Sequence, residues 1–304
     1  MKPRRIAVTG ASGFVGSALV AALRGAGCTV LTIGRHAPGR RSKSIPDVEW
    51  NPRTGTLDAA ALAGVEAVVH LAGSPVGRRW TSARKQEIRE SRVLGTRLIA
   101  QTMARLSPMP QVLVVASAIG YYGSRGDEWL DEESAPGTDF LAEVVVAWEG
   151  AADAARAAGV RVVHARTGLV LGRTGGALAR LLPPFRVGLG GRLGGGRQWM
   201  SWITLADLVS ALRFTLETDT VAGAVNAVSP SPVTNAEFTS TLARVLGRPV
   251  LAPVPAIALR ILFGEMAAAT LLASQRVRPG RLERAGFACE HPKLEEALRF
   301  ELGP

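Results

Sequence analysis

The chain has 304 residues, of which 47% are hydrophobic and 20% are charged. This length predicts two domains or one large domain with an appendage, and the composition excludes a disordered or fibrous chain. The formal net charge of +11 comes almost entirely from arginines, which are spread along the chain. Because nucleic-acid surfaces usually show clusters, we expect no nucleic-acid partner and instead some arginines that contact an anionic small molecule.

The class of protein is limited further by its two cysteines, its four histidines and one apolar stretch. Cys28 and Cys289 lie far apart and the histidines are isolated, so we expect neither a disulfide framework nor a metal site. Leu251–Ala273 resembles a membrane span, but it carries Arg260 and Glu265, which favours an ordinary buried helix. No signal-peptide pattern precedes the first strand. We therefore expect a cytoplasmic protein with no membrane partner.

Strand patterns and helix patterns alternate along the N-terminal half. Short apolar runs bounded by turn residues predict strands, and apolar residues with helical spacing predict helices. We expect strands at 5–9, 28–33, 67–72, 111–117 and 161–166, and helices at 17–25, 82–106 and 140–158. Continuous apolar strands that alternate with helices predict an α/β fold, a doubly wound parallel Rossmann-type sheet with helices on both faces.

The segment after residue 172 follows a different pattern. Residues 175–196 are rich in glycine and too irregular for βα units, whereas strand and helix signals resume within 203–230. We expect residues 1–175 to form the Rossmann domain, with 203–230 returning to its sheet. Residues 176–304 are expected to form a smaller, helix-rich C-terminal cap that contributes to the substrate site.

The segment Thr9–Gly16 follows a strand and opens a helix, which is the context of a dinucleotide-binding turn. Its first glycine permits a tight turn, the second lets the backbone approach a pyrophosphate, and the third allows close packing of the helix on the sheet. The spacing is G-x-x-G-x-x-G, so a purely structural glycine turn is the alternative. The pattern predicts cofactor contacts from Gly10, Ser12, Gly13, Phe14, Val15 and Gly16.

The end of the second strand indicates which dinucleotide binds. An NAD site usually places Asp or Glu there, whereas this chain has Gly34, Arg35 and His36, with no acid before Asp47. The planar guanidinium of Arg35 suits a 2′-phosphate. The sequence therefore favours NADP(H) over NAD(H), and the alternative is that Arg35 is a solvated loop residue.

Motifs along almost the whole chain resemble one branch of a known family. The glycine turn and His70-Leu71-Ala72-Gly73 are similar to motifs of the extended short-chain dehydrogenase/reductases. The further matches include Arg78-Arg79-Trp80-Thr81, Ser91-Arg92-Val93, Ser117-Ala118-Ile119-Gly120-Tyr121-Tyr122-Gly123, Trp148-Glu149, Leu182-Pro183-Pro184-Phe185-Arg186, Gly196-Arg197-Gln198-Trp199 and Gly264-Glu265-Met266-Ala267. Together they resemble an atypical branch, the cell-division-inhibitor-like epimerase family proteins, whose C-terminal helical domain would correspond to about 253–299.

This resemblance implies an NADP(H) site and a set of residues that contact the cofactor. The matching positions are Gly34 and Arg35 at the adenosine end, and Leu71 and Ala72 beside the ribose. Three charged residues match further contacts of the family, namely Glu87, Arg92 and Arg166. For Glu87, the alternative is an exposed helix acid paired with a neighbouring arginine.

The usual catalytic relay of the wider family is absent from this chain. A serine after the fifth strand and a Tyr-x-x-x-Lys pair normally move the proton as the hydride is transferred. Counted from Trp148, the tyrosine and lysine positions fall on Leu141 and Val145, and the serine position falls on Ala118. No Tyr-x-x-x-Lys occurs anywhere in the sequence.

Other side chains are candidates for the proton chemistry. Tyr121 and Tyr122 follow the fifth strand at its carboxyl end, where an open α/β sheet places its ligand crevice, and Ser117 lies one residue from the serine position. The alternative is that both phenols are packing residues. Glu143 is a further candidate, although an acid on the first turn of a helix is more often solvated.

The glycine-rich segment Gly188–Trp199 is predicted to be a lid over an anionic substrate. Arg186, Arg192 and Arg197 would meet the anion, and Trp199 would line the cleft with a tyrosine. A loop that is rich in glycine only because of its tight turns is the alternative.

Two hypotheses of function follow. The first is an NADP(H)-binding oxidoreductase, or a nucleotide-sugar-epimerase-like protein, that acts on an unknown small polar substrate without the Ser-Tyr-Lys relay. The second is a catalytically silent NADP(H)-binding sensor or interaction protein, which the loss of all three relay residues would favour. A nucleic-acid binder driven by charge is the least favoured class.

Overall fold

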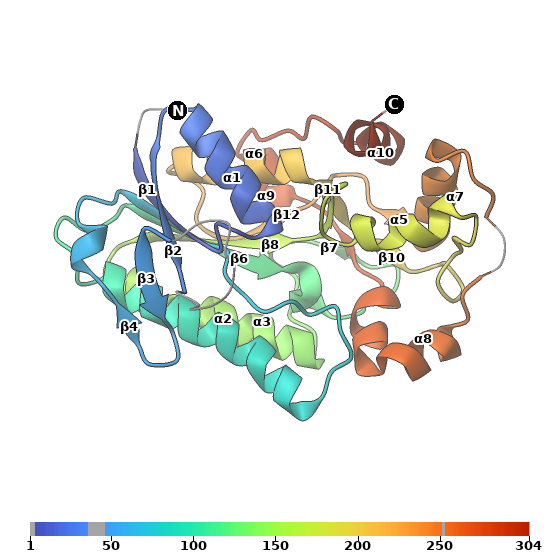
Figure 1. Ribbon diagram of the computed structural model, residues 1–304, viewed down its shortest axis with the longest axis horizontal. Coiled ribbons are helices and arrows are strands. Elements are labelled where there is room, and N and C mark those ends of the chain that lie inside the picture. The colour runs from blue at the N-terminus through green and yellow to red at the C-terminus, as the bar shows by residue number, and fades with distance from the viewer. Residues whose placement is uncertain (1–3, 36–45, 251–252, 304) are drawn as a thin grey trace.

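An eight-stranded sheet lies at the centre of the computed structural model, which describes residues 4–35, 46–250 and 253–303 (Figure 1). Its order is β12-β8-β6-β5-β1-β2-β3-β4, and every neighbouring pair is parallel except β3 with β4. The strands are β1 (Arg5–Thr9), β2 (Thr29–Gly34), β3 (Val48–Asn51), β4 (Thr56–Leu57), β5 (Ala67–His70), β6 (Val112–Ala118), β8 (Arg161–Thr167) and β12 (Gly223–Ala227). The predicted doubly wound parallel sheet is confirmed.

Helices cover both faces of this sheet because its strands carry apolar side chains on both sides. In β1, Ile6 and Val8 pack in one core cluster and Ala7 packs in the other. Figure 1 shows α1 (Phe14–Gly25) and α6 (Leu205–Glu217) on one face of the sheet. The opposite face carries α2 (Ser82–Met103) and α3 (Phe140–Gly150). The short helix α4 (Asp153–Ala157) packs in the core cluster of the same face through Ala155.

Most of the remaining elements belong to the C-terminal half, and several of them pack around a third core that includes Trp202 and Phe238. Three short strand pairs lie outside the central sheet: β7 (Trp129–Leu130) with β14 (Arg276–Val277), β9 (Leu169–Leu171) with β11 (Trp202–Thr204), and β10 (Trp199–Met200) with β13 (Val233–Thr234). The helical elements are η1 (Ala60–Leu62), η2 (Ile119–Tyr122), α5 (Leu178–Arg186), α7 (Asn235–Val245), α8 (Ala256–Phe263), η3 (Ala267–Leu271), α9 (Gly280–Arg284) and α10 (Leu294–Leu302).

The expectation of one buried helix across 251–273 is wrong. Residues 251 and 252 lie outside the described residues, and the rest forms the two short elements α8 and η3. Gly264 has a φ of +62° and ends α8, because a left-handed glycine commonly terminates a helix. Only Leu259 of α8 is buried. Within the described residues, no helix combines the length and the apolar character needed to cross a bilayer.

The turn between β1 and α1 generates the first prediction. A Cβ atom on Gly16 would overlap the carbonyl oxygen of Gly10, whereas a Cβ atom on Gly25, in the same helix, would meet nothing within 4 Å. Gly16→Ala should therefore lower the free energy of unfolding by about 1–3 kcal/mol through overpacking. Gly25→Ala should raise it by about 0.4–1 kcal/mol, because alanine favours the helix.

Urea unfolding of the two variants checks this prediction. If the two substitutions changed the free energy of unfolding equally, the close packing of Gly16 on the turn would be refuted.

Candidate functional site

The candidate site lies where the chain changes direction between β1 and β5. These strands are neighbours in the sheet, but the helix that follows β1 covers one face and the helix that follows β5 covers the other. Open α/β sheets bind ligands in the crevice at such a switch point, outside the carboxyl ends of the strands. The turn Gly10–Gly16 and the segment 71–81 both leave the sheet here.

The glycine turn presents unpaired backbone donors. Gly10 has a φ of +68°, and its carbonyl accepts a hydrogen bond of 2.9 Å from the Gly13 N–H. Gly13 is the N-cap of α1, and α1 has neither a side-chain cap nor an acidic residue in its first turn. The positive end of the helix dipole is therefore free to bind an anion. An open hollow of about 510 Å³ lies here, lined in part by Ser12, Gly13, Phe14 and Ser17.

The ring of Phe14 is held by a second glycine-rich segment. A Cβ atom on Gly172 or Gly175 would overlap this ring, so the loop that follows β9 packs its backbone directly on Phe14. Thr174 of the same loop lines the hollow beside α1. These glycines allow a close approach of backbone to ring, which a side chain at either position would prevent.

The turn is joined to the segment after β5 by a buried threonine and a buried histidine. The Thr9 Oγ1 accepts hydrogen bonds from the Leu71 and Ala72 N–H groups at 3.1 and 3.2 Å, and lies 2.7 Å from His70 Nδ1. Both lone pairs of this hydroxyl are thereby used, so its proton is donated to Nδ1. Burial lowers the pKa of His70 to about 3. The imidazole is therefore neutral and carries its proton on Nε2.

These hydrogen bonds bring the backbone of Gly10 close to the backbone of Ala72. A Cβ atom on Gly10 would lie 2.9 Å from the Ala72 nitrogen, which is nearer than real Cβ contacts allow. Leu71 and Ala72, which the resemblance assigns to the ribose, are thus in contact with the predicted pyrophosphate turn.

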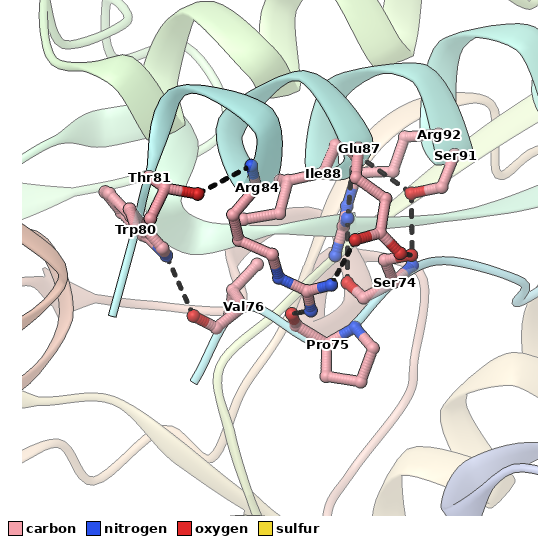
Figure 2. A network of polar contacts seen from close by, with 10 residues as sticks. All are labelled: Ser74, Pro75, Val76, Trp80, Thr81, Arg84, Glu87, Ile88, Ser91 and Arg92. Atoms are coloured by element: carbon pink, nitrogen blue, oxygen red, sulfur yellow. Dashed lines mark hydrogen bonds and ion pairs between the residues drawn. The ribbon is translucent and has the colours of Figure 1, made fainter. Parts of the chain in front are cut away.

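Figure 2 shows how the segment that follows is attached to α2. Ser74 donates from its hydroxyl to Glu87 Oε1 at 2.8 Å, and its N–H donates to the Ser91 hydroxyl at 3.1 Å. Arg84 donates to both the Glu87 carboxylate and the Pro75 carbonyl. The hydrogen bonds from Ser74 and Arg84 lower the pKa of Glu87. Glu87 is therefore paired with a neighbouring arginine and also anchors this segment.

Arg92 binds the same segment from the next turn of α2. Its Nη1 donates to the Ser74 carbonyl at 3.0 Å and to the Ile88 carbonyl at 3.1 Å (Figure 2). Its guanidinium lies 5.0 Å from the centre of the Trp148 ring. Burial, with a smaller effect of the Arg84 charge, lowers the pKa of Arg92 to about 10. Glu87 and Arg92 thus meet at Ser74, at the carboxyl side of β5.

The predicted adenosine end lies one strand away, after β2. Arg35 is exposed and follows Gly34, the last residue of that strand. Two acids lie on the neighbouring segment. The Oδ2 of Asp47 accepts hydrogen bonds from the Thr32 N–H and hydroxyl, at 2.7 and 2.9 Å, and Glu49 pairs with Gly34 in the strand register. The sequence pattern had not indicated Glu49 as a neighbour of this strand end.

A buried ion pair lies at the carboxyl ends of β6 and β8. Arg166 donates from Nε and Nη2 to the two carboxylate oxygens of Glu149, at 2.9 and 2.8 Å. Burial alone would raise the pKa of Glu149, but the hydrogen bonds and charge of Arg166 outweigh it and hold that pKa below its ordinary value. The same pairing raises the pKa of Arg166 against the opposing effect of burial. Both groups are therefore charged at neutral pH.

The three predicted catalytic residues surround this ion pair. Ser117 donates to Glu149 Oε1 at 2.7 Å. Tyr122 is fully buried, accepts from Arg166 at 3.2 Å and donates to the Asn226 side chain at 2.7 Å. Burial raises the pKa of Tyr122 to about 12. Tyr121 is only partly buried, and the Arg166 guanidinium lies 3.4 Å from the centre of its ring.

Glu149 and Asn226 are site residues that sequence reasoning did not assign. The one available signal for Glu149 was its place in the Trp148-Glu149 motif. Asn226 comes from β12, and its role depends on the pairing of β12 with β8, in which Asn226 stands beside Arg166.

The positions of the missing relay lie on α3. Val145 is buried, and Leu141 packs close to Gly120 of η2. Glu143 is exposed on the same helix. The side chains at the relay positions are thus packing residues, and the acid considered as their replacement points to solvent.

The predicted lid is attached to the C-terminal half. The Gly194 N–H donates to the Val254 carbonyl and the Val254 N–H donates to the Arg192 carbonyl, each at 2.8 Å. Trp199 donates to Asp127 at 2.8 Å, and Arg276 lies 4.0 Å from the centres of both the Trp199 and Trp129 rings. Arg186 and Arg197 are exposed. A pocket that joins Tyr121 or Tyr122, Trp199 and at least one of Arg186, Arg192 and Arg197 stays a prediction.

Two sequence profiles match the chain. One is described as the NAD dependent epimerase/dehydratase family and matches residues 6–227, from β1 through β12. The other is described as a domain of unknown function (DUF1731) and matches residues 254–301, which include α8, α9 and most of α10.

Relatives align over almost the full length. An epimerase family protein of Mycobacterium bovis is 47% identical over 296 residues, which are 97% of this chain and 96% of the relative. The crystal structure of the human epimerase family protein SDR39U1 with NADPH is similar at a TM-score of 0.86 and 34% identity, with 98% of each chain covered. A nucleoside-diphosphate sugar epimerase from Corynebacterium glutamicum has a TM-score of 0.78 at 36% identity, covering 99% of this chain and 59% of that chain.

The ion pair generates a prediction on stability and pH. Glu149→Gln leaves the buried Arg166 guanidinium without its counter-charge, so the free energy of unfolding at neutral pH should fall by about 3–5 kcal/mol. The folded-state pKa of Glu149 lies below its ordinary value of 4.5. The contribution of the pair is therefore present above that pH and is lost as the pH falls through the folded-state pKa. The difference between wild type and Glu149→Gln should shrink in that acid range.

Denaturant unfolding across the acid range measures this difference. Glu143→Gln, at an exposed acid of the same helix, is the control and should change stability little at any pH. A wild type and a Glu149→Gln variant with equal stability at neutral pH would contradict the assignment of the pair.

Proposed function

This chain belongs to the NAD dependent epimerase/dehydratase family, and we propose that it is an NADP(H)-binding enzyme of the oxidoreductase or nucleotide-sugar-epimerase-like type. Membership confirms the resemblance that the sequence motifs indicated. The observation that carries the proposal is the uncapped N-terminus of α1 behind the turn Gly10–Gly16, at the switch point of the sheet.

The residues present at this crevice fit an NADP(H) molecule. The free N–H groups of the α1 turn suit a pyrophosphate, and the exposed Arg35 after β2 suits a 2′-phosphate. Asp47, the acid nearest in sequence to Arg35, is hydrogen-bonded back to Thr32. The human relative that was solved with NADPH supports this choice of cofactor.

Each predicted cofactor residue has a role in this proposal. The turn Gly10–Gly16 holds the pyrophosphate, Arg35 holds the 2′-phosphate, and the segment from Leu71 lies beside the ribose. Glu87 and Arg92 keep that segment in place through Ser74 and border the cofactor from α2. Arg166 reaches the cofactor side of the sheet from the end of β8. When bound, NADPH supplies a hydride to a carbonyl carbon of the substrate.

Tyr121 is the side chain we propose for proton transfer. Ser117 and Tyr122 are buried and hydrogen-bonded around the ion pair, so they position the guanidinium of Arg166. That guanidinium stacks on the ring of Tyr121 and favours negative charge that develops on its phenol as the proton moves to the substrate oxygen. The ion pair thus takes the orienting role that the relay lysine has elsewhere in the family.

A silent NADP(H)-binding sensor is the second candidate function. The observation that favours it is the packing of Leu141 and Val145, which leaves no ionisable side chain at either relay position. A sensor would bind NADP(H) with the same preference as the enzyme, but it would not oxidise or reduce a substrate.

The cofactor proposal predicts a strong preference for NADPH. Isothermal titration calorimetry should show NADPH binding at least about tenfold tighter than NADH, a difference of about 1.4 kcal/mol. Arg35→Asp should remove this preference, because a carboxylate repels the 2′-phosphate. Arg97→Asp makes the same charge change at an exposed position of α2 and should leave the preference intact. Equal affinities of the wild type for the two cofactors would refute the role of Arg35.

The proton-transfer proposal predicts opposite effects for the two tyrosines. Mixed with small carbonyl compounds, the wild type should oxidise bound NADPH, and Tyr121→Phe should slow this about 100-fold without a change in melting temperature. Tyr122→Phe should mainly lower stability, by about 1–3 kcal/mol, because it leaves the buried Asn226 side chain without its donor.

The decay of NADPH fluorescence measures turnover in both variants, and denaturant unfolding measures their stability. Unchanged turnover in Tyr121→Phe would exclude the role of that phenol. Tight NADPH binding without oxidation by any carbonyl compound tested would favour the sensor.

A further inference from the structure

Helix α8 is apolar at every position except Arg260, yet most of it faces solvent. The exposed fractions of Ile257, Ile261 and Leu262 are 64%, 67% and 62%. A helix that is apolar on all sides is typical of a buried element, because water opposes such exposure. This face therefore requires an explanation beyond the packing of the chain itself.

The exposed side chains of α8 form one outward surface. Ile257 and Ile261 are one turn apart and share a face, and Leu262 is adjacent to Ile261. Leu259 points the other way and is buried. Figure 1 shows α8 at the periphery of the molecule, away from the central sheet.

The charge around α8 is positive. Arg79 donates to the Ile261 carbonyl at 2.9 Å, so its guanidinium lies at the carboxyl end of the helix, and Arg260 is exposed on α8 itself. The sequence from 238 to 264 contains no Asp or Glu. The acid that follows, Glu265, is neutralised by an ion pair with Lys85.

A second exposed apolar segment adjoins the start of α8. The residues after α5 pair with the segment before α8 through the hydrogen bonds between Val254 and its partners Arg192 and Gly194. Val187 and Leu189 in this region are 70% and 67% exposed. The exposed apolar side chains of α8 thus lie with Arg260 on the same helix and with Arg79 at its carboxyl end.

We propose that α8 docks this protein on an anionic lipid surface. Exposed apolar side chains framed by basic residues are the pattern of a helix that lies in the membrane interface, where the apolar face enters the acyl boundary and the arginines meet anionic headgroups. Such docking needs no membrane-spanning segment, so it is compatible with the length of α8. We had expected no membrane partner because the sequence favours no helix that crosses the bilayer, and that argument does not apply to a helix that lies on the membrane surface.

A second copy of the chain fits this surface less well. A two-fold interface through α8 would bring the positively charged surfaces of two copies together, which like-charge repulsion disfavours. The side chains of one eight-residue helix also cover much less than the roughly 800 Å² per partner of a stable interface. Both the charge and the area therefore favour a lipid surface.

Co-sedimentation with vesicles tests the proposal. The full chain should bind vesicles of phosphatidylcholine and phosphatidylglycerol at least about tenfold more strongly than vesicles of phosphatidylcholine alone. Ile257→Ser combined with Ile261→Ser should reduce this binding at least about tenfold, since it removes the apolar contact. Arg260→Glu should reduce it and weaken its dependence on salt.

Val146→Ser is the matched control, because Val146 is a 45% exposed apolar side chain on another helix, α3. It should leave vesicle binding unchanged, and the melting temperatures should show that every variant is folded. Equal binding to neutral and anionic vesicles, or equal binding of the α8 variant and the wild type, overturns the proposal. A dimer that the α8 substitutions dissociate, without any vesicle binding, overturns it in favour of self-association.

Discussion

The contact between the backbone at Gly10 and the backbone at Ala72 is the constraint on which the candidate site depends. Thr9 and His70 hold it, because one hydroxyl accepts two backbone N–H groups and donates its proton to a buried neutral imidazole. The contact brings the carboxyl ends of β1 and β5 together, where the helices diverge to opposite faces of the sheet. The glycine turn and the segment anchored by Glu87 and Arg92 consequently lie side by side at this edge of the sheet.

The ion pair of Glu149 and Arg166 lies at the same edge of the sheet, at the carboxyl ends of β6 and β8. It joins α3 to β8, and its hydrogen bonds reach Ser117 of β6 and Tyr122 of η2. Because the pair is nearly buried, removing either charge would leave the other without compensation. A chain that lacks the tyrosine and lysine of the family relay thereby keeps a rigid charged group at the end of the sheet, against which Tyr121 stacks.

The sequence predicted those features that depend on local pattern. Apolar strands that alternate with helices indicated the parallel sheet, and a strand followed by Gly10–Gly16 indicated the dinucleotide turn. Glu149 and Asn226 could not be assigned in this way, because their partners lie 17 and 104 residues away and meet them only after the strands pair. The exposure of α8 was missed for a related reason. Hydropathy shows that a segment is apolar, but it does not show whether the fold supplies a surface to cover it.

The central claim is that an NADP(H) molecule lies across the switch point, with its pyrophosphate on the first turn of α1. A crystal structure of the chain grown with NADPH tests this most directly. We predict pyrophosphate oxygens at hydrogen-bond distance from the backbone N–H groups of Phe14 and Val15, and the 2′-phosphate at the guanidinium of Arg35. A cofactor bound elsewhere, or one whose 2′-phosphate makes no contact with Arg35, would contradict it.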